Sequence, residues 1–137
     1  MGAWDRCCVG GTVNGRIQKF TAEGVFVSEW GWQGASPGEQ WRGEGTGDGE
    51  FSFPMGVAVA PDGSVYVADS YNHRIQKFTS EGVFISKRGT ERSGDGGFDY
   101  PIGVAVASDG SVYVADHYNS LIQKFTYGGV FVSKWNT

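Results

Sequence analysis

The apolar residues of this chain fall in short runs, and turn residues interrupt the runs at regular intervals. In the middle of the chain four such runs cover residues 57–60, 65–68, 75–78 and 83–86. They are short and rich in Val, Ile and Phe, which is typical of strands. Gly, Asp, Ser and Asn stand between them and favour tight turns. No window of helical length shows an apolar period of 3.6 residues, so the pattern predicts an antiparallel four-stranded meander.

The first two runs of this meander are apolar on both faces. Val57 and Val59 point to one side of a strand, and Ala58 and Ala60 point to the other. A sheet with one face in water would instead alternate apolar and polar residues. We therefore expect both faces of the meander to be covered by neighbouring sheets.

The meander is repeated along the chain. Residues 53–88 align with residues 100–135 without a gap, at an offset of 47, and 26 of the 36 positions are identical. A third, truncated copy lies upstream, where residues 15–30 match residues 73–88 at 11 of 16 positions. Extending this copy backwards places residues 7–11 opposite residues 65–69, so the first copy lacks the first strand of the unit.

Stacked four-stranded sheets with a repeat of this length are typical of a β-propeller. We expect an all-β chain of four-stranded antiparallel blades that supplies half a ring. The expected organisation is a partial blade with strands two to four over 1–31, a long glycine-rich linker loop over 32–52, a blade over 53–89, a linker over 90–99 and a blade over 100–137.

The repeat unit resembles the NHL repeat. The residues that carry the resemblance are Pro54, Gly56, Asp62, Gly63, Val65, Tyr66, Val67, Asp69, Asn72, Arg74, Ile75 and Phe78. The resemblance implies a six-bladed propeller with a surface that binds protein or RNA. This chain has about two and a half blades. The bare blade faces are expected to be covered either by a homo-oligomer, such as a dimer that closes a ring, or by the remainder of a longer chain.

Charge and cysteine content narrow the classes of partner. The 137 residues carry a net charge of -4, which gives no attraction to nucleic acid or to an anionic membrane. No stretch approaches the roughly 20 apolar residues that cross a bilayer. Two adjacent cysteines and two histidines do not have the spacing of a metal site, so we expect no metal and no cofactor.

The candidate binding residues lie in loops that a propeller gathers on one face. The loops between the second and third strands carry Tyr71, His73, His117 and Tyr118. The long linker adds side chains that often dominate interfaces. The complete set of candidates is Trp32, Trp41, Arg42, Tyr71, His73, Arg88, His117 and Tyr118.

Other polar residues of the repeat favour structural roles. His73 and His117 occupy different positions of the repeat, so we expect exposed loop histidines rather than metal ligands. Asp69 and Asp116 occupy the same position, and a catalytic centre instead needs different residues that converge. We expect these two carboxylates to accept hydrogen bonds from backbone N–H groups at a corner, and we identify no catalytic residue.

These features predict a non-enzymatic NHL-type propeller module that binds a protein or a small ligand through the loops of one face. One alternative is a metal-dependent propeller enzyme of lyase or lactonase type, with metal ligands from other blades or from a second subunit. Another alternative is an RNA-binding surface, which basic residues on the third strands favour and many nearby carboxylates oppose.

Overall fold

The computed structural model describes residues 6–11, 16–30, 47–89 and 96–136, with the backbone alone for residues 6–11 and 16. The described residues form eleven strands and one short 3-10 turn, η2 (Ser70–Asn72). The strands are β1 (Arg6–Gly11), β2 (Arg16–Thr21), β3 (Phe26–Trp30), β4 (Pro54–Val59), β5 (Val65–Asp69), β6 (Arg74–Phe78), β7 (Phe84–Arg88), β8 (Pro101–Val106), β9 (Val112–Asp116), β10 (Leu121–Phe125) and β11 (Phe131–Asn136).

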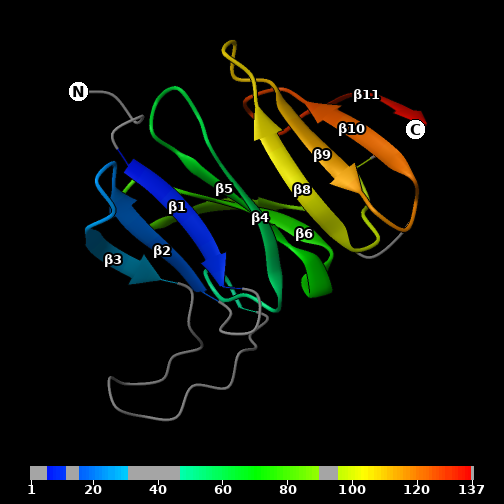
Figure 1. Cartoon of the computed structure of the whole chain (residues 1–137). Helices are drawn as coiled ribbons and strands as arrows, with labels where there is room; N and C mark the ends of the chain where they lie inside the picture. The colour runs from blue at the N-terminus through cyan, green and yellow to red at the C-terminus, as the bar shows by residue number, and fades with distance from the viewer. Residues whose placement is uncertain (1–5, 12–15, 31–46, 90–95, 137) are drawn as a thin grey trace.

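The strands make three separate antiparallel sheets, and within each sheet consecutive strands pair. We call them blade 1 (β1–β3), blade 2 (β4–β7) and blade 3 (β8–β11). The sheets lie side by side in chain order (Figure 1). Contacts between sheets concentrate where β4 meets β8 and where β1 meets β4. The expected all-β architecture of antiparallel four-stranded blades is confirmed.

Three strands of blade 1 lie within the described residues. In blade 1 Cys7 pairs with Phe20, and in blade 2 Val65 pairs with Phe78. The last pair of each register places Gly11 of blade 1 at the position of Asp69 in blade 2. β1 therefore corresponds to the second strand of the unit, and Gly11 stands where the other two blades carry an aspartate.

Two apolar cores lie between the blades. The core between blades 1 and 2 contains Ile17, Trp30, Phe51, Val65, Val67 and Phe78. The core between blades 2 and 3 contains Ala60, Tyr66, Ala68, Ile75, Phe98, Val112, Val114 and Phe125. Alternate residues of β5 thus enter different cores, and every residue of β5 is buried. This arrangement explains why both faces of the sequence pattern are apolar.

The inner strands β4 and β8 approach so closely that one position requires glycine. A Cβ atom at Gly56 would lie 2.9 Å from the carbonyl oxygen of Ile102 and 3.1 Å from Cα of Gly103. Because both neighbours are backbone atoms, no side-chain rotation can relieve such a contact. β4 also begins at Pro54, three residues before the predicted start, because Pro54 pairs with Asp69 across a bulge.

Candidate functional site

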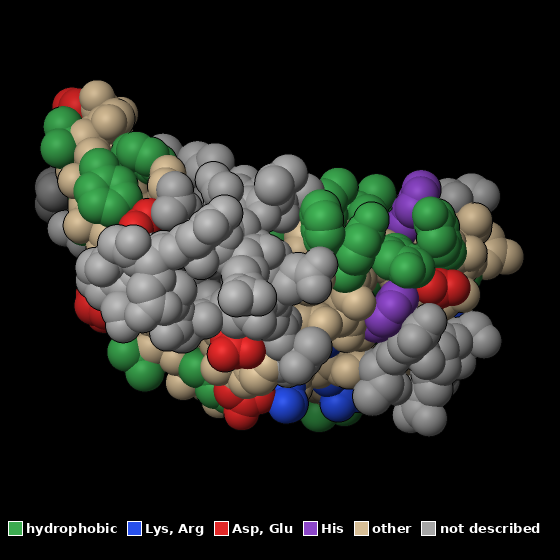
Figure 2. All heavy atoms as spheres, turned by 90° about the horizontal axis from the view of Figure 1, so that it is seen from below, with side chains coloured by type: hydrophobic (Ala, Val, Ile, Leu, Met, Phe, Trp, Pro, Cys, Tyr) green, Lys and Arg blue, Asp and Glu red, His purple; other side chains and the backbone are tan. Residues whose placement is uncertain are grey.

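Four aromatic side chains form a continuous row across blades 2 and 3, which we call the aromatic row: Phe53, Tyr71, Tyr100 and Tyr118. Successive ring centres are separated by 4.2 Å, 5.3 Å and 4.8 Å. The His73 ring lies 4.5 Å from the Tyr100 ring. Figure 2 shows hydrophobic side chains and both histidines gathered on this face.

The repeat itself builds the aromatic row. Phe53 and Tyr100 immediately precede β4 and β8, and their φ angles are 54° and 58°. Positive φ is uncommon for bulky residues, so the surrounding contacts must hold these two positions. The backbone N–H of Tyr71 donates to the carbonyl of Ser52, and that of Tyr118 donates to the carbonyl of Asp99 (both 3.1 Å). Each corner is thereby tied to the segment before the first strand of its own blade.

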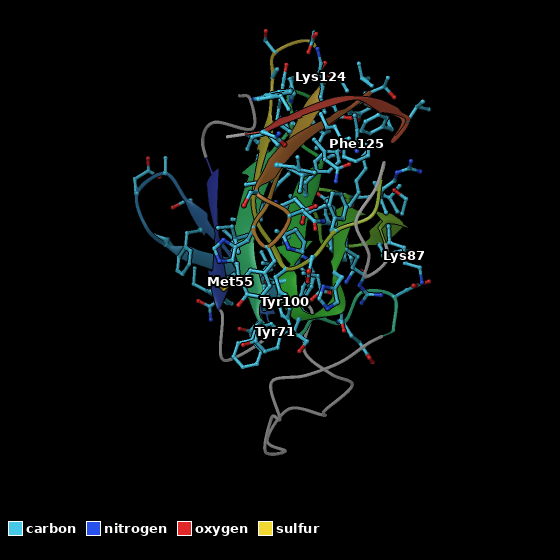
Figure 3. The ribbon with its side chains drawn as sticks, turned by 90° about the vertical axis from the view of Figure 1, so that its right-hand side faces the viewer. Met55, Tyr71, Lys87, Tyr100, Lys124 and Phe125 are labelled. Atoms are coloured by element: carbon cyan, nitrogen blue, oxygen red, sulfur yellow. The ribbon has the colours of Figure 1, made fainter. Side chains whose placement is uncertain are left out.

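The aromatic row presents two of its rings to solvent. Tyr71 is 52% exposed and Tyr118 is 63% exposed. Met55 and Ile102, on the inner strands, are also exposed. Figure 3 places the labelled Met55, Tyr71 and Tyr100 at one end of the sheets. Exposed tyrosines on a rigid scaffold lose little conformational entropy on binding, which suits them to contact a partner.

His73 is buried, so the expectation of an exposed loop histidine is wrong at this position. It is 7% exposed, while His117 is exposed as expected. The backbone N–H of Tyr100 donates to Nδ1 of His73 (3.1 Å), and Oδ1 of Asp99 lies 3.8 Å from the same nitrogen. The segment before β8 folds over His73 and buries it, which its loop position in the sequence did not reveal. His73 therefore helps to place Tyr100.

Asp69 is the centre of a buried polar network in blade 2. Its Oδ1 accepts a hydrogen bond from the backbone N–H of Ser52 (2.7 Å). Its Oδ2 accepts from the side chains of Asn72 (3.0 Å), Arg74 (2.8 Å) and Gln76 (3.1 Å). The backbone donor belongs to the segment before β4, and η2 at the corner has no side-chain cap. Burial raises the pKa of Asp69, while the hydrogen bonds from Asn72, Ser52 and Arg74 oppose that rise.

Asp116 repeats this network in blade 3 with one change. It accepts hydrogen bonds from the backbone N–H of Asp99 (2.7 Å) and from the side chains of Asn119 (2.7 Å) and Gln123 (3.2 Å). Leu121 stands where blade 2 has Arg74, so this carboxylate has no arginine beside it at that position. Both aspartates connect the segment before a first strand to the corner of the same blade, which is a structural role.

The other sequence candidates are distributed differently. Trp32, Trp41 and Arg42 lie outside the described residues. Tyr71, His73, His117 and Tyr118 come together in or beside the aromatic row. Arg88 lies apart from it, between blades 2 and 3, with Cζ 5.4 Å from the centre of the Phe125 ring.

Sequence reasoning missed Phe53 and Tyr100, which complete the aromatic row. The available signal was an aromatic residue immediately before Pro54 and Pro101, at the head of both full repeats. In the described part of the chain, no group of three or more His, Cys, Asp or Glu side chains is arranged to hold a metal ion. No helix in that part is long and apolar enough to pass through a bilayer.

Three antiparallel sheets packed face to face, with their first strands innermost where those strands are present, define an arc of a β-propeller. The family model for the NHL repeat matches residues 51–78 and 98–125. Blades 2 and 3 therefore each contain an NHL repeat.

Curated relatives share this repeat over short stretches. The chain is 52% identical over 44 residues to protein lin-41 of Caenorhabditis elegans, which covers 32% of this chain and 4% of that protein. It is 34% identical over 79 residues to peptidyl-glycine alpha-amidating monooxygenase A of Xenopus laevis, which covers 56% of this chain and 8% of that protein. The chain thus spans less than a tenth of either relative.

Solved structures share the fold. The hydrazine synthase of Kuenenia stuttgartiensis superposes with a TM-score of 0.69 and 16% sequence identity, over 97% of this chain and 33% of that chain. The likeness at this low identity is one of architecture. This chain spans about a third of that structure.

Proposed function

We propose that the chain is a non-enzymatic binding module whose aromatic row receives a protein partner. The observation that carries the proposal is the uninterrupted contact of four rings across two blades, with Tyr71 and Tyr118 more than half exposed. Tyrosine is among the residue types that most often dominate binding energy at interfaces. Propellers of this kind generally mediate protein interactions, which supports the same choice.

The partner meets a surface that is largely formed before binding. The rings of Phe53 and Tyr100 are the less exposed members of the row. Their positive φ angles are held by surrounding contacts, among them the hydrogen bond from the backbone N–H of Tyr100 to His73. Tyr71 and Tyr118 pack against these two rings, so few side chains lose conformational freedom when a partner binds. The exposed rings of Tyr71 and Tyr118 suit proline rings or other aromatic side chains of an extended segment.

Site-specific crosslinking tests this proposal. A photo-reactive phenylalanine at position 118 should crosslink a protein in extracts, and the same residue at exposed position 130 should not. After the partner is identified, Tyr71→Ser with Tyr118→Ser should weaken its binding by at least about 30-fold, the effect of losing roughly 2 kcal/mol at a hot spot. Val130→Ser serves as the control. Equal crosslinking at both positions, or unchanged affinity in the double variant, would overturn the proposal.

The metal-dependent enzyme of lyase or lactonase type is the alternative. This alternative is supported by two proteins that are named as enzymes, the amidating monooxygenase with a similar sequence and the hydrazine synthase with a similar fold. Elemental analysis of the purified chain distinguishes the two proposals, since stoichiometric zinc or calcium would favour the enzyme. A single-stranded RNA oligonucleotide at 150 mM salt, about the ionic strength that screens weak charge contacts, tests the RNA alternative.

We also propose that a further blade covers the outer face of blade 3, supplied by a second copy or by a longer chain. Trp30 and Trp135 occupy the same position of the repeat, yet Trp30 is 9% exposed against blade 2 and Trp135 is 46% exposed. Light scattering after gel filtration should show a species of twice the chain mass of 14.8 kDa if two copies pair. A stable monomer with Trp135 exposed would contradict pairing of two copies.

A further inference from the structure

The two interfaces between blades differ at one position of the repeat. Trp30, Arg88 and Trp135 occupy this position in blades 1, 2 and 3. In the first interface the ring of Trp30 packs 5.9 Å from the ring of Phe78. In the second interface Arg88 extends over Phe125, the equivalent of Phe78. An indole is thus present between blades 1 and 2, and a guanidinium replaces it between blades 2 and 3.

Two equivalent glycines show the space that this replacement leaves. Gly82 and Gly129 have the same backbone conformation, with φ of 90° and 89°. A Cβ atom at Gly82 would lie 2.8 Å from ring carbons of Trp30. A Cβ atom at Gly129 would have no heavy atom within 4 Å. The two glycines therefore share a backbone conformation, but the space that the Trp30 ring fills beside Gly82 is unfilled beside Gly129.

A pocket of about 330 Å³ occupies this place between blades 2 and 3. Its walls are mainly apolar, formed by Tyr66, Ile75, Phe98, Val112, Val114 and Phe125. Three cationic side chains, Lys77, Lys87 and Arg88, also line it. The labelled Lys87 and Phe125 lie well away from Tyr71 and Tyr100 (Figure 3). A concave apolar site with a few polar groups is typical of small-molecule binding.

The three cations differ in how their charge is balanced. Lys87 pairs with Asp48 at 2.7 Å. Nζ of Lys77 lies 3.8 Å from the centre of the Tyr127 ring, and the nearby Asp62 carboxylate attracts it. Within the described part of the chain, no carboxylate forms an ion pair with Arg88. Among the described residues, Arg88 is therefore the cation of this pocket without a carboxylate partner, and its side chain is exposed to an incoming anionic group.

Another substitution keeps the lysine of this interface near the pocket. In the first interface the equivalent Lys19 is buried and donates to the carbonyl oxygen of Ser80 at 2.6 Å. In the second interface Tyr127 replaces Ser80, and Lys77 lies over its ring instead of bonding to a carbonyl. The second interface therefore has an unfilled space beside Gly129 and two cations, Lys77 and Arg88, at its edge. Neither cation makes the carbonyl hydrogen bond that holds Lys19 in the first interface.

We infer that this pocket binds a small aromatic carboxylate. The ring of the ligand occupies the volume that Trp30 fills in the first interface and packs against Phe98 and Phe125. Its carboxylate pairs with the guanidinium of Arg88, whose planar donors match two carboxylate oxygens. The site lies between two blades and is independent of the aromatic row.

Indole-3-acetate is a suitable probe, since it joins an indole to a carboxylate, and its neutral amide is a matched control. The full chain should bind indole-3-acetate saturably with a dissociation constant on the order of 1 mM, given about 0.3 kcal/mol per heavy atom. The backbone amide signals of Ser86, Gly128 and Gly129 should shift in NMR titrations. Indole-3-acetamide should bind at least about tenfold more weakly, the effect of losing one charge-assisted hydrogen bond.

Two variants separate the volume from the charge. Arg88→Trp copies blade 1 and should abolish binding of both probes, with a midpoint of thermal unfolding at or above that of the wild type. Arg88→Gln keeps the space and should bind the acid and the amide equally. Absence of a saturable shift at 10 mM indole-3-acetate, equal binding of acid and amide by the wild type, or full binding by folded Arg88→Trp would each overturn the inference.

Discussion

Blades 2 and 3 are nearly the same sequence in two different surroundings. They share 26 of 36 aligned residues, and each is a four-stranded meander. In β5 every residue is buried, whereas in β9 Tyr113 and Ala115 are only half-buried. The residues of β9 that remain buried are those that face blade 2. The repeat sequence therefore determines that the second strand forms in each blade. Its second face becomes buried only where another blade packs against it, as blade 3 does on β5.

The same comparison applies to the polar networks. Asp69 is paired with Arg74, whose side chain is only 8% exposed, and Asp116 has Leu121 at that position. One carboxylate balances a buried charge, and the other serves neutral donors. Loss of Asp69 would therefore leave a buried guanidinium without its carboxylate, whereas loss of Asp116 would leave only neutral donors unpaired.

The largest difference is expected when each aspartate is replaced by alanine. Asp69→Ala leaves the guanidinium of Arg74 buried without its carboxylate, and breaking such a pair costs about 3–5 kcal/mol. Asp116→Ala leaves only neutral donors unpaired, at a cost of about 1–3 kcal/mol. Urea unfolding followed by circular dichroism measures both free energies. Equal losses would show that Arg74 contributes nothing to the difference between the blades.

A smaller difference is expected at the equivalent glycines of the inner strands. Gly56→Ala should lower the free energy of unfolding by about 1–3 kcal/mol, because the new methyl group meets the backbone of β8. A Cβ atom at Gly103 meets only Cβ of Ala115, at 3.5 Å. Gly103→Ala should therefore be neutral or stabilising by up to about 1 kcal/mol.

The glycine pair also reports on the outer face of blade 3. If another blade packs there as blade 3 packs on blade 2, Gly103→Ala should be as costly as Gly56→Ala in the assembled protein. Measuring both variants at low and high protein concentration distinguishes a lone arc from an association of copies. A cost at Gly103 that appears only at high concentration would identify a second copy as the cover.

The smallest expected effect is on alkaline stability. Burial, aided by the charge of Asp62, raises the pKa of Tyr66 from 10.0 to about 12. Between these two values the unfolded chain releases the phenolic proton more readily than the folded chain, so the free energy of unfolding falls as the pH rises from 10 to 12. Tyr66→Phe should remove that part of the fall. Urea unfolding at pH 9, 10 and 11 measures it, and an unchanged slope would contradict the assignment.

The fold was predictable because it depends on local sequence patterns, and the same pattern occurs in both full copies of the repeat. Alternating apolar positions predicted the strands and the two covered faces of blade 2. The burial of His73 was not predictable, since it depends on the segment before β8, which is distant in the sequence. The pocket between blades 2 and 3 was not predictable for a related reason. The sequence shows Arg88 in place of Trp30, but it does not show that Trp30 is buried between two blades.

Glycine in place of aspartate at position 11 has a consequence for how the arc opens. Blade 1 has no carboxylate at that position to join its second strand to a preceding segment, and Gln18 bonds to Glu29 of the outer strand instead (3.3 Å). We therefore expect blade 1, without this buried carboxylate, to open locally before the chain unfolds as a whole. Amide hydrogens of β2 should therefore exchange with deuterium before those of β5 and β9, so that the chain loses its order from the N-terminal blade inward.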